Sequence, residues 1–191
     1  MEEKNTREII LMEALNLFSN KGYAAVSMRD IAMAVGIRVS SIYHHFSGKQ
    51  ALFEALIQKA TDVKEALQDV FLNALSKAGR VEEEAFVQTG IYFLTGYLQN
   101  AQVEPLLKVL ECERFHNEDA DRVWKELVIF TPLEHEENVF RLLRERGEIV
   151  DATTDKELAA EYQAAIMMAY FTGDIQQLQI QLHHFYKRIF I

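Results

Sequence analysis

The sequence has 191 residues, of which 49% are hydrophobic and 26% charged, with only 8 glycines and 2 prolines. This composition can fill a packed core and excludes general disorder. A single cysteine excludes an internal disulfide framework and any zinc site built from several cysteines. No apolar run approaches the ~18 residues of a membrane span, and the N-terminus lacks the pattern of a signal peptide. We therefore expect a soluble, cytoplasmic protein with no membrane partner.

Charge is distributed unevenly along the chain. There are 20 basic and 29 acidic residues, a net charge of −9. Residues 1–50 hold six basic and five acidic side chains, a net +1, which leaves a net −10 for residues 51–191. Acidic proteins are usually poor ligands for polyanions, but a near-neutral head on an acidic body is compatible with a local DNA-binding face.

The first part of the chain predicts short helices joined by tight turns. Apolar residues recur at i, i+4, i+7 within residues 5–20, which is typical of a helix with one buried face. Ser27 and Asp30 have the spacing of a capping box at the start of a second helix. A third helix is predicted over 39–46 and a long one over 48–77. The order is that of a helix-turn-helix followed by a connecting helix.

The remaining residues also show helical rather than strand-like patterns. Glycine and proline mark the predicted breaks, and Pro132 is expected to separate two helices. The predicted segments are 82–100, 104–116, 118–130, 132–146, 154–172 and 174–190.

Many spaced positions within residues 9–56 form a recognisable series. They are Ile10-x3-Ala14-Leu15-x-Leu17-Phe18, Lys21-Gly22-Tyr23, Val26-Ser27-Met28-Arg29-Asp30-Ile31-Ala32, Val35-Gly36-Ile37, Ser41-Ile42-Tyr43-His44-His45-Phe46, Lys49 and Ala51-Leu52. The series resembles the N-terminal DNA-binding domain of the TetR family of bacterial regulators. The resemblance implies an all-α fold of about nine helices. It places a helix-turn-helix domain over 1–50 and a helical effector-binding and dimerisation domain over 51–191.

The resemblance also implies which side chains contact DNA. Arg38 departs from the family pattern, which commonly has a small hydroxyl residue there, and Ser40 stands where glycine is frequent. Which side chains at the start of the recognition helix reach bases therefore stays open. Each candidate could instead be an ordinary solvated or packing residue. The predicted contact residues are Ser27, Arg29, Arg38, Ser40, Ser41, Tyr43, His44 and Lys49.

Two C-terminal segments carry apolar stripes that suggest a dimer interface. Spacings of 3, 4 and 3 separate the members of the stripe in 174–190, as in a coiled-coil seam. The resemblance implies that such helices pair with those of a second subunit on a two-fold axis. In the alternative, the stripes only close the core of one subunit. The interface candidates are Leu158, Tyr162, Ile166, Ile175, Leu178, Leu182 and Phe185.

Aromatic residues mixed with polar ones over 82–130 suggest an effector pocket, although an aromatic core has the same composition. The pocket candidates are Tyr97, Trp124, Phe93 and Thr95.

Cys112 and His116 share a helical face, but the run lacks the ligand number of a zinc site, so we expect no metal. The acidic run Glu134–Glu137 is predicted to be a solvated helix face.

These observations and the resemblance predict a homodimeric transcriptional repressor that binds double-stranded DNA at a palindromic operator. An unidentified small-molecule effector would release it. No phosphate loop, GxSxG or HExxH motif is present, so we expect neither an enzyme nor a cofactor. The alternative is a helical interaction module whose helix-turn-helix no longer binds DNA. Activation instead of repression also stays open.

Overall fold

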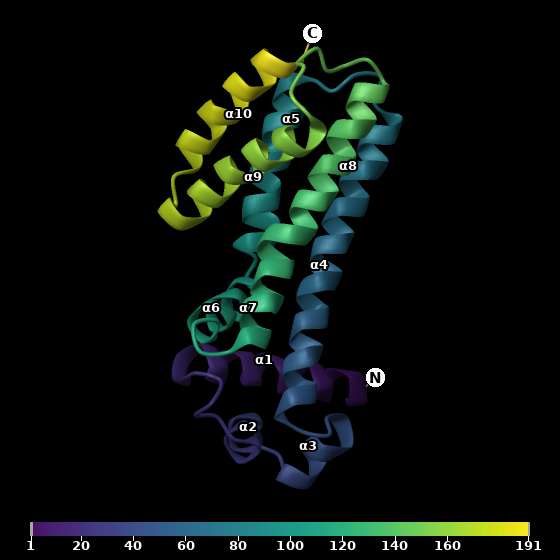
Figure 1. Ribbon diagram of the computed structural model, residues 1–191. Helices are drawn as coiled ribbons and strands as arrows, with labels where there is room; N and C mark the ends of the chain where they lie inside the picture. Colours follow the sequence, from purple (N-terminus) through teal and green to yellow (C-terminus); the bar gives the residue numbers. More distant parts are fainter. Residues whose placement is uncertain (1, 191) are drawn as a thin grey trace. The chain divides into compact units, whose positions relative to one another are not determined.

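The computed structural model describes residues 2–190, with side chains from residue 5 onward. Its helices, shown in Figure 1, are α1 (Glu2–Lys21), α2 (Met28–Val35), α3 (Val39–His45), α4 (Lys49–Lys77), α5 (Glu83–Phe93), η1 (Leu94–Leu98), α6 (Glu104–Glu113), α7 (Glu118–Lys125), η2 (Glu126–Phe130), α8 (Thr131–Glu145), α9 (Asp155–Thr172) and α10 (Ile175–Ile189).

The expected all-α class is confirmed. The segments η1 and η2 are π-helical and continue directly from the α-helices before them, so residues 2–190 contain nine unbroken helical stretches. Within these residues the β structure is limited to one isolated antiparallel bridge, between Ile149 and Phe190. No helix in the described part of the chain is both long and apolar enough to cross a membrane.

The chain divides into two compact units. The first unit comprises Met1–Val63 and Ala101–Trp124, and the second comprises Lys64–Asn100 and Lys125–Ile191. Residues 101–124 belong to the first unit because α6 packs against α1. This division does not follow the sequence-based boundary at residue 50, since packing between distant segments is not visible in local composition.

The core of the first unit holds the helix-turn-helix together. Ile10 and Phe18 of α1, Ile31 of α2, and Ile42 and Phe46 at α3 each expose 4% of their surface or less. Burying such side chains contributes about 1.5–3 kcal/mol each. The three helices therefore hold the outer faces of α2 and α3 in a fixed arrangement.

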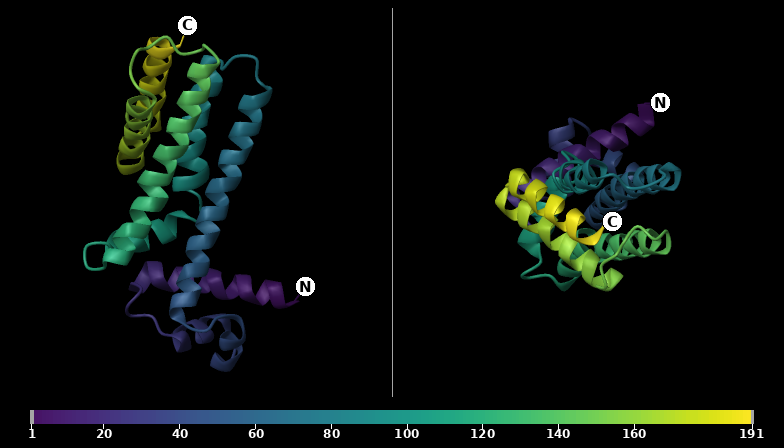
Figure 2. Two further views of the ribbon diagram at one scale, coloured as in Figure 1. Left: turned by 45° about the vertical axis from the view of Figure 1, so that its right-hand side comes forward. Right: turned by 90° about the horizontal axis from the view of Figure 1, so that it is seen from above.

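The second unit has an aromatic core built from four helices. Phe86 of α5, Phe140 of α8, Tyr162 of α9 and Phe185 of α10 contribute one ring each, with ring centroids 5.3–6.4 Å apart. Figure 2 shows α9 and α10 running side by side, and they pack against each other and on α8 and α5 respectively. This cluster fixes the inner walls of a cavity described below.

Pro132 does not end a helix, and the predicted break there is wrong. Proline has no N–H, so carbonyl groups one turn earlier lose their helical donor. The structure supplies replacements from other helices: the Tyr97 hydroxyl donates to Leu127 O at 3.2 Å, and Gln163 Nε2 donates to Val128 O at 2.9 Å. The π-helix η2 and α8 therefore continue through the proline as one segment.

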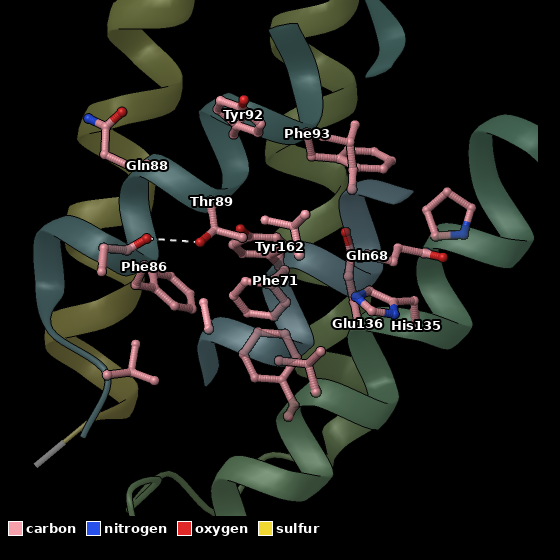
Figure 3. Close-up of a pocket in the computed structure, with 18 of the residues that line it drawn as sticks. Gln68, Phe71, Phe86, Gln88, Thr89, Tyr92, Phe93, His135, Glu136 and Tyr162 are labelled. Atoms are coloured by element: carbon pink, nitrogen blue, oxygen red, sulfur yellow. Dashed lines mark hydrogen bonds between the residues drawn. The ribbon is translucent and has the colours of Figure 1, made fainter. Parts of the chain in front are cut away.

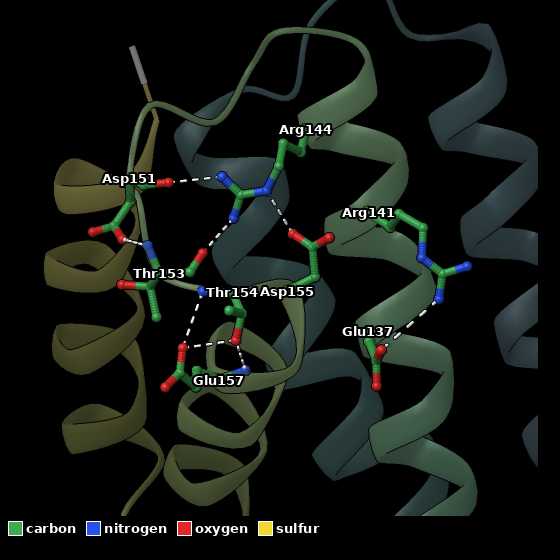
Figure 4. Close-up of polar contacts among 8 residues, drawn as sticks. All are labelled: Glu137, Arg141, Arg144, Asp151, Thr153, Thr154, Asp155 and Glu157. Atoms are coloured by element: carbon green, nitrogen blue, oxygen red, sulfur yellow. Dashed lines mark hydrogen bonds and ion pairs between the residues drawn. The ribbon is translucent and has the colours of Figure 1, made fainter.

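The connection from α8 to α9 is held by one guanidinium group (Figure 4). Arg144 Nε donates to Asp155 Oδ1 at 2.7 Å, and its terminal nitrogens donate to Asp151 O at 2.7 Å and Thr153 O at 2.5 Å. Thr154 and Glu157 then begin α9 with a capping box. This loop is therefore tied to both of the helices that it joins.

Candidate DNA-contact face and ligand cavity

The predicted start of α2 is confirmed. Ser27 Oγ accepts from the N–H of Asp30, and the Ser27 N–H donates to Asp30 Oδ2 at 2.8 Å. Hydrogen bonds to the Asp30 carboxylate, first from the Ser27 hydroxyl and then from the Ser27 N–H, lower the pKa of this carboxyl group. Gly36 ends α2 at φ +77°, in the left-handed region that favours glycine. The turn between α2 and α3 is therefore set by its own sequence.

The outer face of this helix pair is polar and open to solvent. Arg29 of α2 and Ser40, Tyr43 and His44 of α3 are exposed, and Tyr43 exposes 52% of its surface. Arg38, at the entrance of α3, is exposed as well. Such side chains can donate to phosphate oxygens or to base edges in a groove. Ser27 is exposed but its hydroxyl is held by Asp30, and Ser41 is half-buried.

Arg38 leaves α3 without a side-chain cap. It occupies the N-cap position in an extended conformation, and its side chain makes no capping hydrogen bond. Its carbonyl accepts from the Ser41 N–H at 2.9 Å. No side-chain hydroxyl at the N-cap position therefore accepts from the backbone N–H groups in the first turn of α3.

Lys49 is engaged inside the first unit. Its ammonium group donates to Tyr23 O at 2.7 Å and Val26 O at 2.9 Å, and it lies 4.4 Å from the centre of the Tyr23 ring. The side chain therefore ties the start of α4 to the loop before α2. The sequence predicted that Lys49 contacts a DNA phosphate. In the structure its ammonium group instead binds backbone carbonyl groups of the same unit, so we leave Lys49 out of the proposed contact set.

A cavity of about 340 Å³ lies within the second unit, between α4, α5 and α8, with Tyr162 of α9 at its inner end. Its walls are mainly apolar and aromatic, and they include Phe71, Phe86 and Phe93 (Figure 3). Gln68, His135 and Glu136 lie together on one side of it. The volume and lining are those of a site for a small, mostly apolar molecule with a few orienting contacts.

Of the four residues predicted to line a pocket, only Phe93 does so. Tyr97 is fully buried, and its hydroxyl donates a hydrogen bond to Leu127 O, as described above. Thr95 is exposed and bonds back to Ile91 O. Trp124 belongs to the first unit, where the Arg114 guanidinium lies 3.9 Å from the centre of its ring. Composition predicted an aromatic region correctly, but it could not separate core rings from lining rings.

The ionisable groups of the cavity are shifted toward their neutral forms. Burial raises the pKa of the Glu136 carboxyl well above its usual range. Burial, and secondarily the charge of Glu136, raises the pKa of the Tyr162 hydroxyl. Burial, followed by the charge of Lys64, lowers the pKa of His135. The cause in each case is the removal of water from the charged form.

Glu136 and His135 are the functional candidates that sequence reasoning missed. The run Glu134–Glu137 was predicted to be a solvated face, but Glu136 exposes only 8% of its surface. A signal was available, because residues 132, 136, 139, 140 and 143 share one helical face and all the others are apolar. A carboxylate on an apolar stripe marks a buried polar site.

The predicted dimer stripe is buried within the subunit, and this prediction is corrected. The residues that expose 6% or less are Leu158, Tyr162, Ile166, Leu178, Leu182 and Phe185. They pack among α5, α8, α9 and α10, so the alternative reading, closure of the subunit's own core, holds for all six. Ile175 alone among the seven is exposed, at 36%. Periodicity identifies a buried face but not the helix that covers it.

Comparison with known proteins identifies the first domain. The family model described as "Bacterial regulatory proteins, tetR family" matches residues 10–56. The chain carries a TetR-family helix-turn-helix domain. The matched stretch comprises α2 and α3, with most of α1 and the beginning of α4. The matched family is described as one of regulatory proteins.

Among curated relatives, the negative transcriptional regulator IcaR of the biofilm operon of Staphylococcus aureus is 36% identical over 56 residues, 29% of this chain and 30% of IcaR. The chain thus matches under a third of that relative. A protein of Mesorhizobium loti assigned to the TetR family has a TM-score of 0.74 at 21% identity, over 100% of both chains. SmeT, solved as a complex with triclosan, has a TM-score of 0.73 at 14% identity, over 98% of this chain and 92% of SmeT. The structural likenesses confirm the TetR-type fold over the full length.

Proposed function

We propose that this TetR-family chain is a homodimeric transcriptional repressor that binds a palindromic operator and is released by a small molecule held in the second unit. The observation that carries the proposal is the TetR-family match over residues 10–56 together with the exposed polar face of α2 and α3. The matched relative IcaR is a negative regulator, which supports repression.

The DNA contacts in this proposal come from exposed side chains. Arg29 reaches phosphate or an edge base from α2, and Tyr43 and His44 reach the backbone from α3. Ser40 and Arg38 lie exposed at the start of α3, which has no side-chain cap. In a dimer the two α3 helices would enter successive major grooves, about 34 Å apart.

A different face of α9 and α10 supports dimerisation. The exposed residues Ala160, Ala164, Met168 and Phe171 recur at spacings of 4, 4 and 3 along α9, and α10 exposes Ile180 at 49%. Small residues permit close approach between helices, and exposed apolar side chains in a row favour a partner. We propose this face, in place of the buried stripe, as the contact between subunits.

Helix α4 provides a physical connection between the effector cavity and the DNA-binding domain. It is one continuous helix of 29 residues whose first part belongs to the first unit and whose last part lines the cavity with Gln68 and Phe71. A ligand that packs better against one position of α4 than another shifts the population of DNA-binding states. By linkage, operator DNA then weakens ligand binding by the same factor.

Selection from a random pool of duplex DNA, followed by titration of the winner at several salt concentrations, tests the DNA-binding function. We expect a palindromic site and an affinity that falls with salt in proportion to the phosphates contacted. Arg29→Ala should reduce the slope of log K against log salt by about one contact. Arg122→Ala, which removes an exposed arginine paired with Asp119 on α7, is the matched control and should leave the slope unchanged.

The same experiment decides the alternatives. If no sequence is enriched, the interaction-module hypothesis replaces DNA binding. Analytical ultracentrifugation of Ala164→Arg tests the dimer, because an arginine at this exposed position should give a folded monomer with weak operator binding. Repression and activation are then separated by where the operator lies relative to a promoter.

A further inference from the structure

The cavity of the second unit contains one acidic side chain that nothing in the described part of the chain satisfies. Glu136 Oε2 is buried and has no hydrogen-bond partner, and the residue exposes only 8% of its surface. Gln68 Nε2, on the same side of the cavity, is likewise buried without a partner. Buried polar atoms normally have partners, so two such atoms beside an open volume indicate that a ligand provides them.

The charge of the cavity determines which kind of ligand fits. Among the described residues that line it, Glu136 is the single carboxylate and there is no lysine or arginine. Among the described residues that line the cavity, His135 is the one that can carry a positive charge, and burial together with the charge of Lys64 lowers its pKa. An anionic ligand would therefore face a carboxyl group without a countercharge. A cationic ligand would convert Glu136 into a paired carboxylate.

The walls favour the same kind of molecule. The rings of Phe71, Phe86, Tyr92, Phe93, Phe140 and Tyr162 surround the volume. Aromatic faces attract an organic cation, most strongly where water is excluded, and they bury its apolar part. Gln68 adds a donor for an oxygen acceptor elsewhere on the ligand.

We infer that the ligand of this cavity is an apolar organic cation, an alkyl or aryl ammonium, whose positive group lies against Glu136. The inference rests on the proposed function insofar as the cavity is taken to be the effector site. It goes beyond that function by assigning the chemical class of the effector and the residue that selects it.

Calorimetric titration of the DNA-free protein tests the inference with a pair of probes that differ only in charge. The probes are (4-phenylbutyl)trimethylammonium and its neutral isostere, in which a tert-butyl group replaces the trimethylammonium group. We expect the cation to bind about tenfold more tightly than the isostere. Glu136→Gln should remove most of this preference, leaving what the aromatic rings contribute, while the affinity for the neutral probe stays within about threefold.

Glu137→Gln is the matched control. It removes the same charge from the next residue of α8, whose side chain points to Arg141 and does not line the cavity (Figure 4). It should retain the preference for the cation. Thermal unfolding of both variants shows that they are folded. Equal binding of the two probes by the wild type would overturn the inference, as would a preference that Glu136→Gln leaves undiminished.

A separate measurement of operator release distinguishes this inference from the proposed function. Preferential binding of the cation without operator binding would support the ligand class and refute the regulator. Operator binding that is released only by the neutral probe would refute the ligand class and support the regulator.

Discussion

Gly90 offers a sharp test of the packing described above. It lies in the middle of α5, and a Cβ atom added there would be 2.5 Å from Leu182 Cδ1 and 2.9 Å from the Tyr162 hydroxyl oxygen. Non-bonded carbon atoms normally lie about 3.5–4.0 Å apart. The Gly90→Ala substitution would therefore force the neighbouring side chains or α5 itself to move by about 1 Å.

The neighbours have little room to move. Leu182 is fully buried, and the Tyr162 ring is wedged between Phe86 and Phe140 at centroid distances of 5.3 and 5.9 Å. Overpacking of this kind costs about 1–3 kcal/mol, and two simultaneous clashes place Gly90→Ala near the upper end. Alanine also improves helix propensity by about 1 kcal/mol. We expect the free energy of unfolding to fall by about 1–2 kcal/mol.

Gly96 supplies the matched control in the same helical stretch. A Cβ atom there would lie 3.5–3.6 Å from Tyr92 and Leu67, which is ordinary contact. Gly96→Ala should raise the free energy of unfolding by about 0.5–1 kcal/mol through helix propensity alone. Urea denaturation of the two variants therefore gives opposite signs. Equal stabilities for Gly90→Ala and Gly96→Ala would refute the close approach of α5 to α9 and α10.

Three further predictions concern single polar groups. Tyr97→Phe should lower the free energy of unfolding by about 1–3 kcal/mol, because it leaves the buried carbonyl of Leu127 without a donor; urea denaturation measures the loss. Burial raises the pKa of Glu136 in the folded state, so both states are protonated below pH ~4.3 and only the unfolded state ionises just above it. The free energy of unfolding of the wild type and of Glu136→Gln is measured across pH. Relative to the variant, that of the wild type should fall by up to about 1.4 kcal/mol for each pH unit, until the pH passes the pKa of Glu136 in the folded state. Ser27→Ala removes the capping box with Asp30 and should cost about 1 kcal/mol in thermal or urea unfolding.

Each of these predictions has a control within the chain. Tyr92→Phe changes an exposed tyrosine and should leave stability unchanged, so an equal loss in both tyrosine variants would contradict the carbonyl argument. Glu137→Gln removes a carboxyl group from the same helix but outside the cavity, and it serves as the control for Glu136→Gln. Ser40→Ala changes an exposed serine in α3, and a cost matching that of Ser27→Ala would argue against a specific cap.

Local features of the sequence were sufficient to predict most of the helices and several of their ends. The Ser27–Asp30 box begins α2 as predicted, and Gly36 and Gly173 end α2 and α9 in left-handed conformations. These features depend on hydrogen bonds and dihedral angles within a few residues of one another. The TetR-family series over residues 10–56 is likewise a local pattern, because the helix-turn-helix is nearly continuous in sequence.

Contacts between distant segments decided what local patterns could not. The spacing of Leu178 and Leu182 predicted a buried face, but only packing against α5 shows that the subunit covers it itself. Pro132 continues a helix because Tyr97 and Gln163, far away in sequence, supply the missing donors. Glu136 looked solvated within an acidic run, yet the rings of other helices enclose it. Periodicity records that a side chain is buried, whereas its partner depends on how the chain brings remote helices together.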